Sequence, residues 1–363
     1  MSNYSDIKFA GTSAQEPPFR NLIINGDMSI AQRGTSTASV TTSGYYACDR
    51  WRAGIDTAGT WTISQDADVP NAQGFQKSTK VDCTTANGSL SAGSLFYIQQ
   101  IFEGQNLQYL KKGTSSAESL TVSFWVKSVK TGTYICELKD DNNRTISKSY
   151  TINSASTWEK KTITFAGDTT GGAIANDKTG GLEISWWLVA GTTFTSGTLQ
   201  TSWDSLTNAN RAVGQVNLAD NTANNFWITG VQLEAGTTAS DFEFLPVDVN
   251  LQRCQRYLHR VQGISGDEKG IGAGFCSDTT RAAITVIHPV TMRAEPTISE
   301  AAIEIAHRLS TSSVSLGGDT DETLNVSTLL LDADAGSPFT SGDGVRARLD
   351  NSTSAFLQLD AEL

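Results

Sequence analysis

The sequence is poor in charge, and it has no long apolar run. Of its 363 residues, only 18% are Asp, Glu, Lys or Arg, below the roughly 25% that is typical of globular chains. Thr, Ser, Gly and Asn take their place, which favours short strands and turns over long surface helices. With 38% hydrophobic residues, the chain still has enough apolar side chains to bury a core.

The lack of long apolar segments excludes a transmembrane helix. The longest apolar run, 184–190, is far too short to cross a bilayer. The opening, MSNYSDIKFAGTSAQEPPF, has no apolar signal core. We therefore expect no membrane insertion, and we expect export, if it occurs, as part of a particle.

Paired cysteines are absent as well. The five cysteines are far apart and odd in number, and no CxxC occurs: Cys48, Cys83, Cys136, Cys254 and Cys276. Zinc ribbons and redox pairs therefore have no support. The spacing predicts five buried, unpaired thiols, which fit assembly in a reducing cytoplasm.

Positive charge is also scarce, because the formal net charge is -11. Such a chain has no electrostatic footprint for phosphate backbones, so we expect no nucleic-acid partner. Two interpretations of the acidity stay open. It provides solubility alone, or it supports divalent-ion bridging to a cell envelope.

Alternation of apolar and polar residues is what the chain does have. In 120–129 and 182–189, one set of alternate side chains is apolar through 126 and 188 respectively, which is typical of strands with one face in a core. Trp125 and Trp187 fall on the mixed faces of these strands. Strands of this kind, separated by Gly, Asn, Asp and Ser turns, predict an all-β fold built as a two-sheet sandwich.

Four segments follow from these patterns. Residues 1–19 read as an extended arm, because Pro17-Pro18 disfavours helix. A two-sheet sandwich is expected over 20–246, a short helical linker over 247–258, and a small C-terminal β-domain over 259–363. The arm either attaches the chain to a neighbouring protein or is a loose terminus.

Five sequence islands occur in a recognisable order. They are NLIINGDMSIAQRG at 21–34, GYYACDRW at 44–51, GVQLEAG at 230–236, LQRCQRYL at 251–258 and HPVTMRAEPT at 288–297. Together they resemble a jelly-roll module, with its following β-domain, that is common in bacteriophage tail fibres and other virion appendage proteins.

The resemblance implies a structural tail-fibre or receptor-binding protein of the virion tail that is assembled in the bacterial host cytoplasm and adheres to a host surface glycan. It further implies a homotrimer, with the N-terminal arm attached to other tail or virion proteins. A purely architectural component, such as an adaptor or decoration protein, is the first alternative. A glycan-degrading tailspike is the second.

Catalytic chemistry finds little support in the residues. No HExxH, GxSxG or phosphate loop occurs. Glycan hydrolysis needs two carboxylates roughly 5 to 9 Å apart, and the acidic candidates lie mostly in turn-like segments (Asp66, Asp68, Glu183 and Asp204, with 319–322). We predict no enzyme activity, catalytic residue, cofactor or metal-ligand set.

Calcium is a separate question. The segment 332–336 faintly resembles a calcium loop but lacks the full set of oxygen ligands. An ordinary acidic turn is expected there, and a structural calcium site elsewhere in the sandwich stays open.

Glycan contact is assigned to two groups of side chains. Aromatic faces stack on the apolar faces of sugars, and carboxylates accept hydrogen bonds from sugar hydroxyls. The C-terminal domain is expected to be the host-facing end, with its polar loops at 317–323 and 332–344 presenting the acids. The candidates are Trp125, Trp187, Trp203, Asp319, Asp321, Asp334 and Asp343. A covering loop, sheet curvature or a subunit interface would bury the tryptophans instead, and the acids would then be solvated turns.

Overall fold

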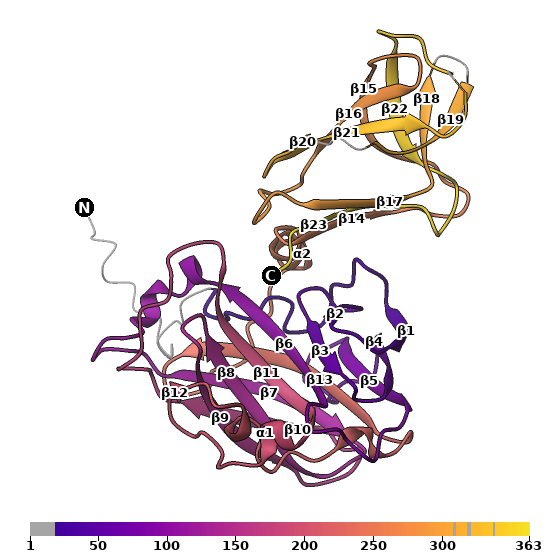
Figure 1. Ribbon diagram of the computed structural model, residues 1–363. Helices are drawn as coiled ribbons and strands as arrows, with labels where there is room; N and C mark the ends of the chain where they lie inside the picture. The colour runs from indigo at the N-terminus through magenta and orange to yellow at the C-terminus, as the bar shows by residue number, and fades with distance from the viewer. Residues whose placement is uncertain (1–18, 308–309, 318–320, 337) are drawn as a thin grey trace, which may run out of the picture.

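A computed structural model describes residues 19–363 apart from 308–309, 318–320 and 337 (Figure 1). Its architecture is all-β, as the alternation predicts, with many antiparallel strands and only short helices. The expected arm at 1–19 lies outside the described residues except for Phe19.

The larger part is a sandwich of two antiparallel sheets. The first sheet contains, in spatial order, β1 (Ser36–Val40), β4 (Thr60–Asp66), β5 (Ser78–Thr85), β13 (Asn225–Ala235), β7 (Leu120–Ser128) and β10 (Glu159–Phe165). The second contains β12 (Asp204–Ser205), β9 (Arg144–Ile152), β8 (Gly132–Asp140), β11 (Gly180–Ala190), β6 (Leu95–Glu103), β3 (Arg52–Asp56) and β2 (Gly44–Tyr45). Phe124 of β7 and Trp186 of β11 meet between the sheets with ring centroids 5.6 Å apart. The inward faces of both strands therefore form the core, as their alternation predicts.

A short helix joins this sandwich to the second part. Helix α2 (Val247–Gln255) leads into a three-stranded sheet of β14 (Leu258–Gln262), β23 (Phe356–Asp360) and β17 (Thr297–Ala301). Figure 1 shows this sheet between α2 and the remaining strands.

Those remaining strands close into a small barrel. Its strands are β16 (Arg281–Ile287), β15 (Lys269–Cys276), β22 (Gly344–Leu349), β18 (Ile303–His307), β19 (Ser310–Leu316) and β21 (Val326–Ala333), with β20 (Asp321–Glu322) beside β21. Pairing of β16 with β21 completes the ring. The barrel has its own core, which includes Ile284, Leu329 and Leu331. Closure removes the free sheet edges that would otherwise pair with other chains.

The sequence islands meet where the two parts join. Asn25, with φ of 58°, donates through Nδ2 to the carbonyl oxygens of Ile30 (2.9 Å) and Asp49 (3.0 Å). Its own carbonyl accepts from Trp51 Nε1 at 3.0 Å, and its N–H donates to Asn250 of α2 at 3.2 Å. Asn25 of the first island therefore holds loops together, which is a structural role.

Gly26 of the first island lies too close to a neighbouring strand to carry a side chain. A Cβ added there would lie 2.1 Å from the carbonyl oxygen of Val231 on β13, a distance that no side chain tolerates. Only glycine lets the first loop lie against this strand. The NGD turn and the GVQLEAG strand are thus packed against each other.

Buried charges fasten the C-terminal tail to the sandwich. The Arg50 guanidinium is 1% exposed, contacts the Glu362 carboxylate, and lies 3.5 Å from the centroid of the Tyr257 ring. Arg33 contacts both Asp360 (2.9 Å) and Glu362 (3.3 Å). We call Arg33, Arg50, Asp360 and Glu362 the tail latch. It joins the C-terminal tail to the sandwich through buried ion pairs.

The cysteine prediction is confirmed. All five thiols are buried and unpaired. Burial raises the pKa of Cys48 to about 12, so this thiol stays protonated and unreactive at neutral pH. Within the described ranges, no helix is long and apolar enough to span a bilayer.

Candidate functional site

The predicted glycan-contact residues do not converge on one place. Trp125 lies on the outer face of the first sheet, whereas Trp187 lies on the outer face of the second. Trp203 lies in the loop before β12. Asp334 and Asp343 lie in the barrel. Asp319 falls outside the described residues, as does the side chain of Asp321.

Trp187 is not available to a ligand in this structure. It is 0% exposed, because the segment 191–216, with α1 (Thr192–Thr195), covers the second sheet. Phe194 packs against the indole at 5.3 Å, and Arg211 lies over it at 5.0 Å while pairing with Glu137 at 2.8 Å. The covering loop fills the place that a sugar would need, so Trp187 is removed from the glycan-contact candidates.

Trp203 keeps part of its surface but is tied to the sandwich. Its Nε1 donates to the Ala166 carbonyl at 2.7 Å. Its ring lies 5.7 Å from Lys112 Nζ, a buried cation held between Asp140 (2.5 Å) and Asp168 (3.2 Å). This ion cluster needs no added cation, since Lys112 already supplies the positive charge.

On the outer face of the first sheet, tryptophan and lysine side chains lie beside one another. Trp227 of β13 lies opposite Lys127 of β7 in the ladder, and Lys80 of β5 lies opposite Trp227 on its other side. Lys127 Nζ is 4.2 Å from the Trp227 ring centroid and 5.4 Å from that of Trp158. We call Trp125, Trp158 and Trp227, with Lys127 among them, the tryptophan face. All three indoles are only partly buried.

Two carboxylates fix the rings of this face. Trp227 Nε1 donates to Asp66 at 3.2 Å, and Trp158 Nε1 donates to Asp68 at 2.9 Å. Lys127 pairs with Asp68 as well. Burial acts to raise the pKa of Asp68, but the hydrogen bonds from Lys127 and Trp158 outweigh it and lower the pKa below its ordinary value. Asp68 is therefore an ionised acceptor that orients the indole, not a proton donor.

Beside this face, Trp125 lines a groove of about 320 Å³. On the ladder Trp125 lies opposite Lys160 of β10 and Thr229 of β13. Other residues that line the groove are Gln73, Phe75, Ser123, Asp241, Phe242 and Phe244. We call it the Trp125 groove. Its aromatic and polar lining is typical of sites for small polar ligands with one apolar face.

The far wall of the groove is an aromatic cluster. Phe75, Phe242 and Phe244 pack with ring centroids 4.8 to 5.1 Å apart, and Phe244 is 52% exposed. Gly230 makes room for this cluster, because a Cβ there would lie 2.5 Å from the Phe75 ring. Its φ of +61° is also one that glycine adopts without strain.

The barrel acids show no comparable enclosure. Asp334 is exposed and shares a shallow hollow of about 370 Å³ with Glu300, Glu304 and Asp350. Asp332 lies in β21 opposite Arg281 of β16 and pairs with it at 2.6 Å. Among the described residues, no group of three or more His, Cys, Asp or Glu side chains is arranged to hold a metal ion.

Trp158 and Trp227 were not among the residues singled out from the sequence. For Trp227 the signal is present: Phe226 and Ile228 share one face of the strand, and Trp227 shares the other with Asn225 and Thr229, which places a large aromatic on the polar side. Trp158 precedes its strand, so alternation does not place it. Only the fold brings it beside Lys127.

Comparison with known proteins finds similar solved structures but no matching family. No family profile and no curated protein matches the sequence. Among solved structures, tailspike protein 4 of bacteriophage CBA120 is 13% identical, with a TM-score of 0.30 over 60% of this chain and 22% of that one.

Two carbohydrate-binding modules give similar values. TmCBM61, solved with β-1,4-galactotriose, is 12% identical, with a TM-score of 0.31 over 60% of this chain and 99% of that one. The family 22 module of Clostridium thermocellum Xyn10B is 10% identical, with a TM-score of 0.29 over 53% and 89% of the two chains. TM-scores of this size carry no functional argument, so function rests on the chain's own surface.

Proposed function

We propose that this chain is a non-catalytic carbohydrate-binding protein that uses the tryptophan face and the Trp125 groove. The observation that carries the proposal is the gathering of Trp125, Trp158 and Trp227, all partly exposed, on the outer face of one sheet. Pyranose rings present apolar C–H faces that pack on such indoles, and the neighbouring Lys, Asp, Gln and Ser side chains supply hydrogen bonds for hydroxyls.

Preorganisation supports the proposal. The indoles of Trp158 and Trp227 are held by Asp68 and Asp66 before any ligand arrives. A held ring loses little conformational entropy on binding, so more of the stacking energy appears as affinity. A shallow site of this kind gives weak binding per copy, which a multimer multiplies.

The biological setting that we propose is a bacteriophage tail appendage that adheres to a host surface glycan. The ordered sequence islands, from NLIINGD to HPVTMRAEPT, support it. A virion location, an arm attached to other tail proteins and a host-facing barrel belong to the same proposal.

Titration of the purified chain against an array of bacterial surface glycans tests the proposal. We expect saturable binding that weakens about tenfold or more in Trp125→Ala and in Trp227→Ala, since each removes a stacking surface. Trp203→Ala and Asp334→Ala are the controls, because each alters another candidate residue away from the face.

The outcomes separate the alternatives. Loss of binding only in Trp203→Ala or Asp334→Ala moves the site to the second loop region or to the barrel. No binding to any glycan favours the architectural role. Release of reducing ends from a bound glycan favours a glycan-degrading tailspike.

A further inference from the structure

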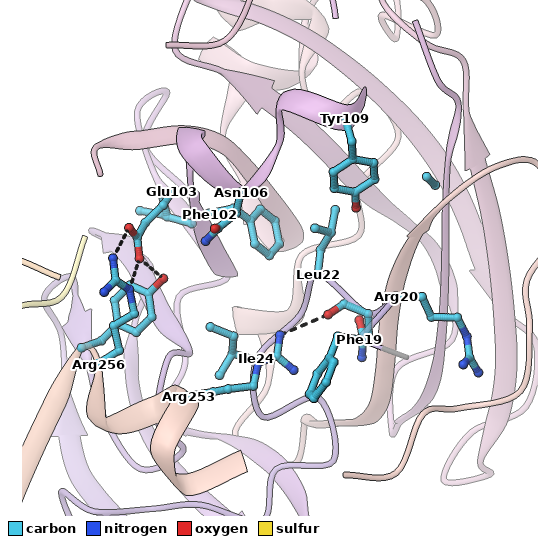
Figure 2. Close-up of a pocket in the computed structure, with 14 residues that line it drawn as sticks. Phe19, Arg20, Leu22, Ile24, Phe102, Glu103, Asn106, Tyr109, Arg253 and Arg256 are labelled. Atoms are coloured by element: carbon cyan, nitrogen blue, oxygen red, sulfur yellow. Dashed lines mark hydrogen bonds and ion pairs between the residues drawn. The ribbon is translucent and has the colours of Figure 1, made fainter. Parts of the chain in front are cut away.

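A second cavity of the described chain lies away from the tryptophan face, beside the junction. It has a volume of about 520 Å³ and forms where the first described residues, the end of β6 and helix α2 meet (Figure 2). Its apolar walls come from Phe19, Leu22, Ile24, Ile101, Phe102 and Ala235. A cavity of this size suits a small organic molecule.

Most charges around the cavity are already paired. Arg256 makes two hydrogen bonds of 2.7 Å to Glu103, which also accepts from Tyr257 at 2.6 Å and from Gln105 at 2.6 Å. Arg20 donates to Ser240 at 2.7 Å and lies 3.6 Å from Glu234. Neither of these arginines needs a ligand for its charge.

Arg253 is different. Its only hydrogen bond within the described residues runs from Nη2 to the Asn21 carbonyl at 3.2 Å, and no carboxylate there lies within ion-pair distance. Burial acts against its charge and lowers the pKa of the guanidinium. In a protein with a net charge of -11, a cavity-lining cation with unused donors is a local exception, and it attracts anions.

Two further polar groups face the same space without partners. Figure 2 shows the Tyr109 hydroxyl directed towards the cavity, and Asn106 lies beside it. Neither side chain makes a hydrogen bond within the described part of the chain. A few uncommitted polar groups in an otherwise apolar cavity are characteristic of ligand sites.

We propose that this cavity binds a small organic acid whose carboxylate pairs with Arg253 and whose body is apolar. The planar guanidinium matches a carboxylate with two parallel hydrogen bonds. Tyr109 and Asn106 supply further donors, and the walls exclude water from an apolar ring or chain. A sugar acid fits less well, because its hydroxyls would face Phe19, Leu22 and Phe102 unpaired.

Calorimetric titration of the full chain tests this site directly. The probes are benzoate, cyclohexanecarboxylate, benzamide and glucuronate. We expect both apolar acids to bind saturably, and benzamide, which lacks the charge, to bind about tenfold or more weakly. Binding of benzamide equal to that of benzoate, or no saturable binding of either acid at millimolar concentration, would overturn the proposal. If glucuronate bound more tightly than both apolar acids, the proposal that the ligand has an apolar body would be wrong.

Three variants connect binding to these residues. Arg253→Gln should weaken benzoate binding about tenfold or more, and Tyr109→Phe by a smaller factor of about three. Tyr109 is 49% exposed and keeps its ring in the variant, so folding is preserved even if Arg253→Gln loosens α2. Arg346→Gln, which removes an exposed cation of β22, should change nothing. Undiminished benzoate binding in both cavity variants contradicts the assignment.

Discussion

Arg50 belongs to the DRW island, and its surroundings explain why an arginine is needed there. Its guanidinium donates from Nη2 to the Ile101 carbonyl at 2.7 Å and also contacts Glu362 across the junction. The planar group stacks on Tyr257 as well. A lysine would supply one charge centre without this fork and without the stacking surface.

Replacing this residue tests the tail latch. Arg50→Met should lower the free energy of unfolding by about 3 kcal/mol, because breaking a buried pair leaves groups unsatisfied. The value is expected at the lower end of such costs, since Arg33 still contacts Glu362. Urea denaturation measures the change.

The matched control is Lys111→Met, which breaks a pair with Glu118 whose side chains are 53% and 40% exposed. Exposed pairs contribute less than about 1 kcal/mol. Equal losses in the two variants would mean that the latch contributes no more than a surface ion pair.

Asp49, the neighbour of Arg50, predicts a pH effect. Burial raises the pKa of its carboxyl to about 6, although Gln32 donates two hydrogen bonds to it, of 2.8 and 2.6 Å. The folded state therefore holds the proton more tightly than the unfolded chain. The resulting contribution to stability is present below about pH 4 and is lost as the pH rises through 6.

Comparing the wild type with Asp49→Asn isolates this effect. From pH 4 to pH 7, the stability of the wild type should fall by about 2 kcal/mol relative to the variant, which cannot titrate. Chemical denaturation of both proteins at the two pH values measures it. A difference that does not change with pH would show that Asp49 titrates normally.

At the scale of elements, alternation was a sound guide to strands and a poor guide to what covers them. The inward faces of β7 and β11 were predictable, because a strand with period-two apolar residues has one face in a core. Which outer face stays open was not, since Trp125 and Trp187 have the same local pattern. Phe194 and Arg211 decide it, and their contact with Trp187 arises only when the connecting segment folds back.

The closure of the barrel is a second feature that the sequence pattern does not predict. β16 and β21 pair from Arg281 with Asp332 to Ile287 with Val326, across about forty residues of intervening chain. Nothing in either strand alone specifies the partner. The tail latch was equally hidden, because the alternation at the end of the chain predicts a strand but not the arginines that its acids meet.

At the scale of the whole molecule, the homotrimer remains a proposal, and the exposed apolar residues indicate where its interface would lie. Two apolar residues of β11 that alternation places on its outer face, Trp187 and Val189, are 0% exposed within one chain, and Val189 belongs to the main core. The barrel now offers the better surface, since Phe275 of β15 and Ile287 of β16 are 54% and 74% exposed. Large exposed apolar side chains on neighbouring strands are typical of interfaces.

Light scattering at micromolar concentration should therefore give the mass of a trimer. Ile287→Lys combined with Phe275→Ser should shift it towards the monomer, because a charge at an apolar interface is costly. Ile264→Ser, at a residue 48% exposed outside the barrel strands, serves as the control. A wild-type chain that stays monomeric without other particle proteins contradicts the proposal.

The tail latch also has a mechanical consequence. A pull that separates the barrel from the sandwich is not carried by helix α2 alone. Part of the force is carried by the ion pairs of Arg33 and Arg50 with Asp360 and Glu362. Another part is carried by Arg293, which donates to the carbonyls of Ala361 (2.7 Å) and Glu362 (3.0 Å). Because these contacts are loaded in parallel, several of them must break at once before the two parts separate. The joint should therefore transmit tension with less extension than a flexible linker would.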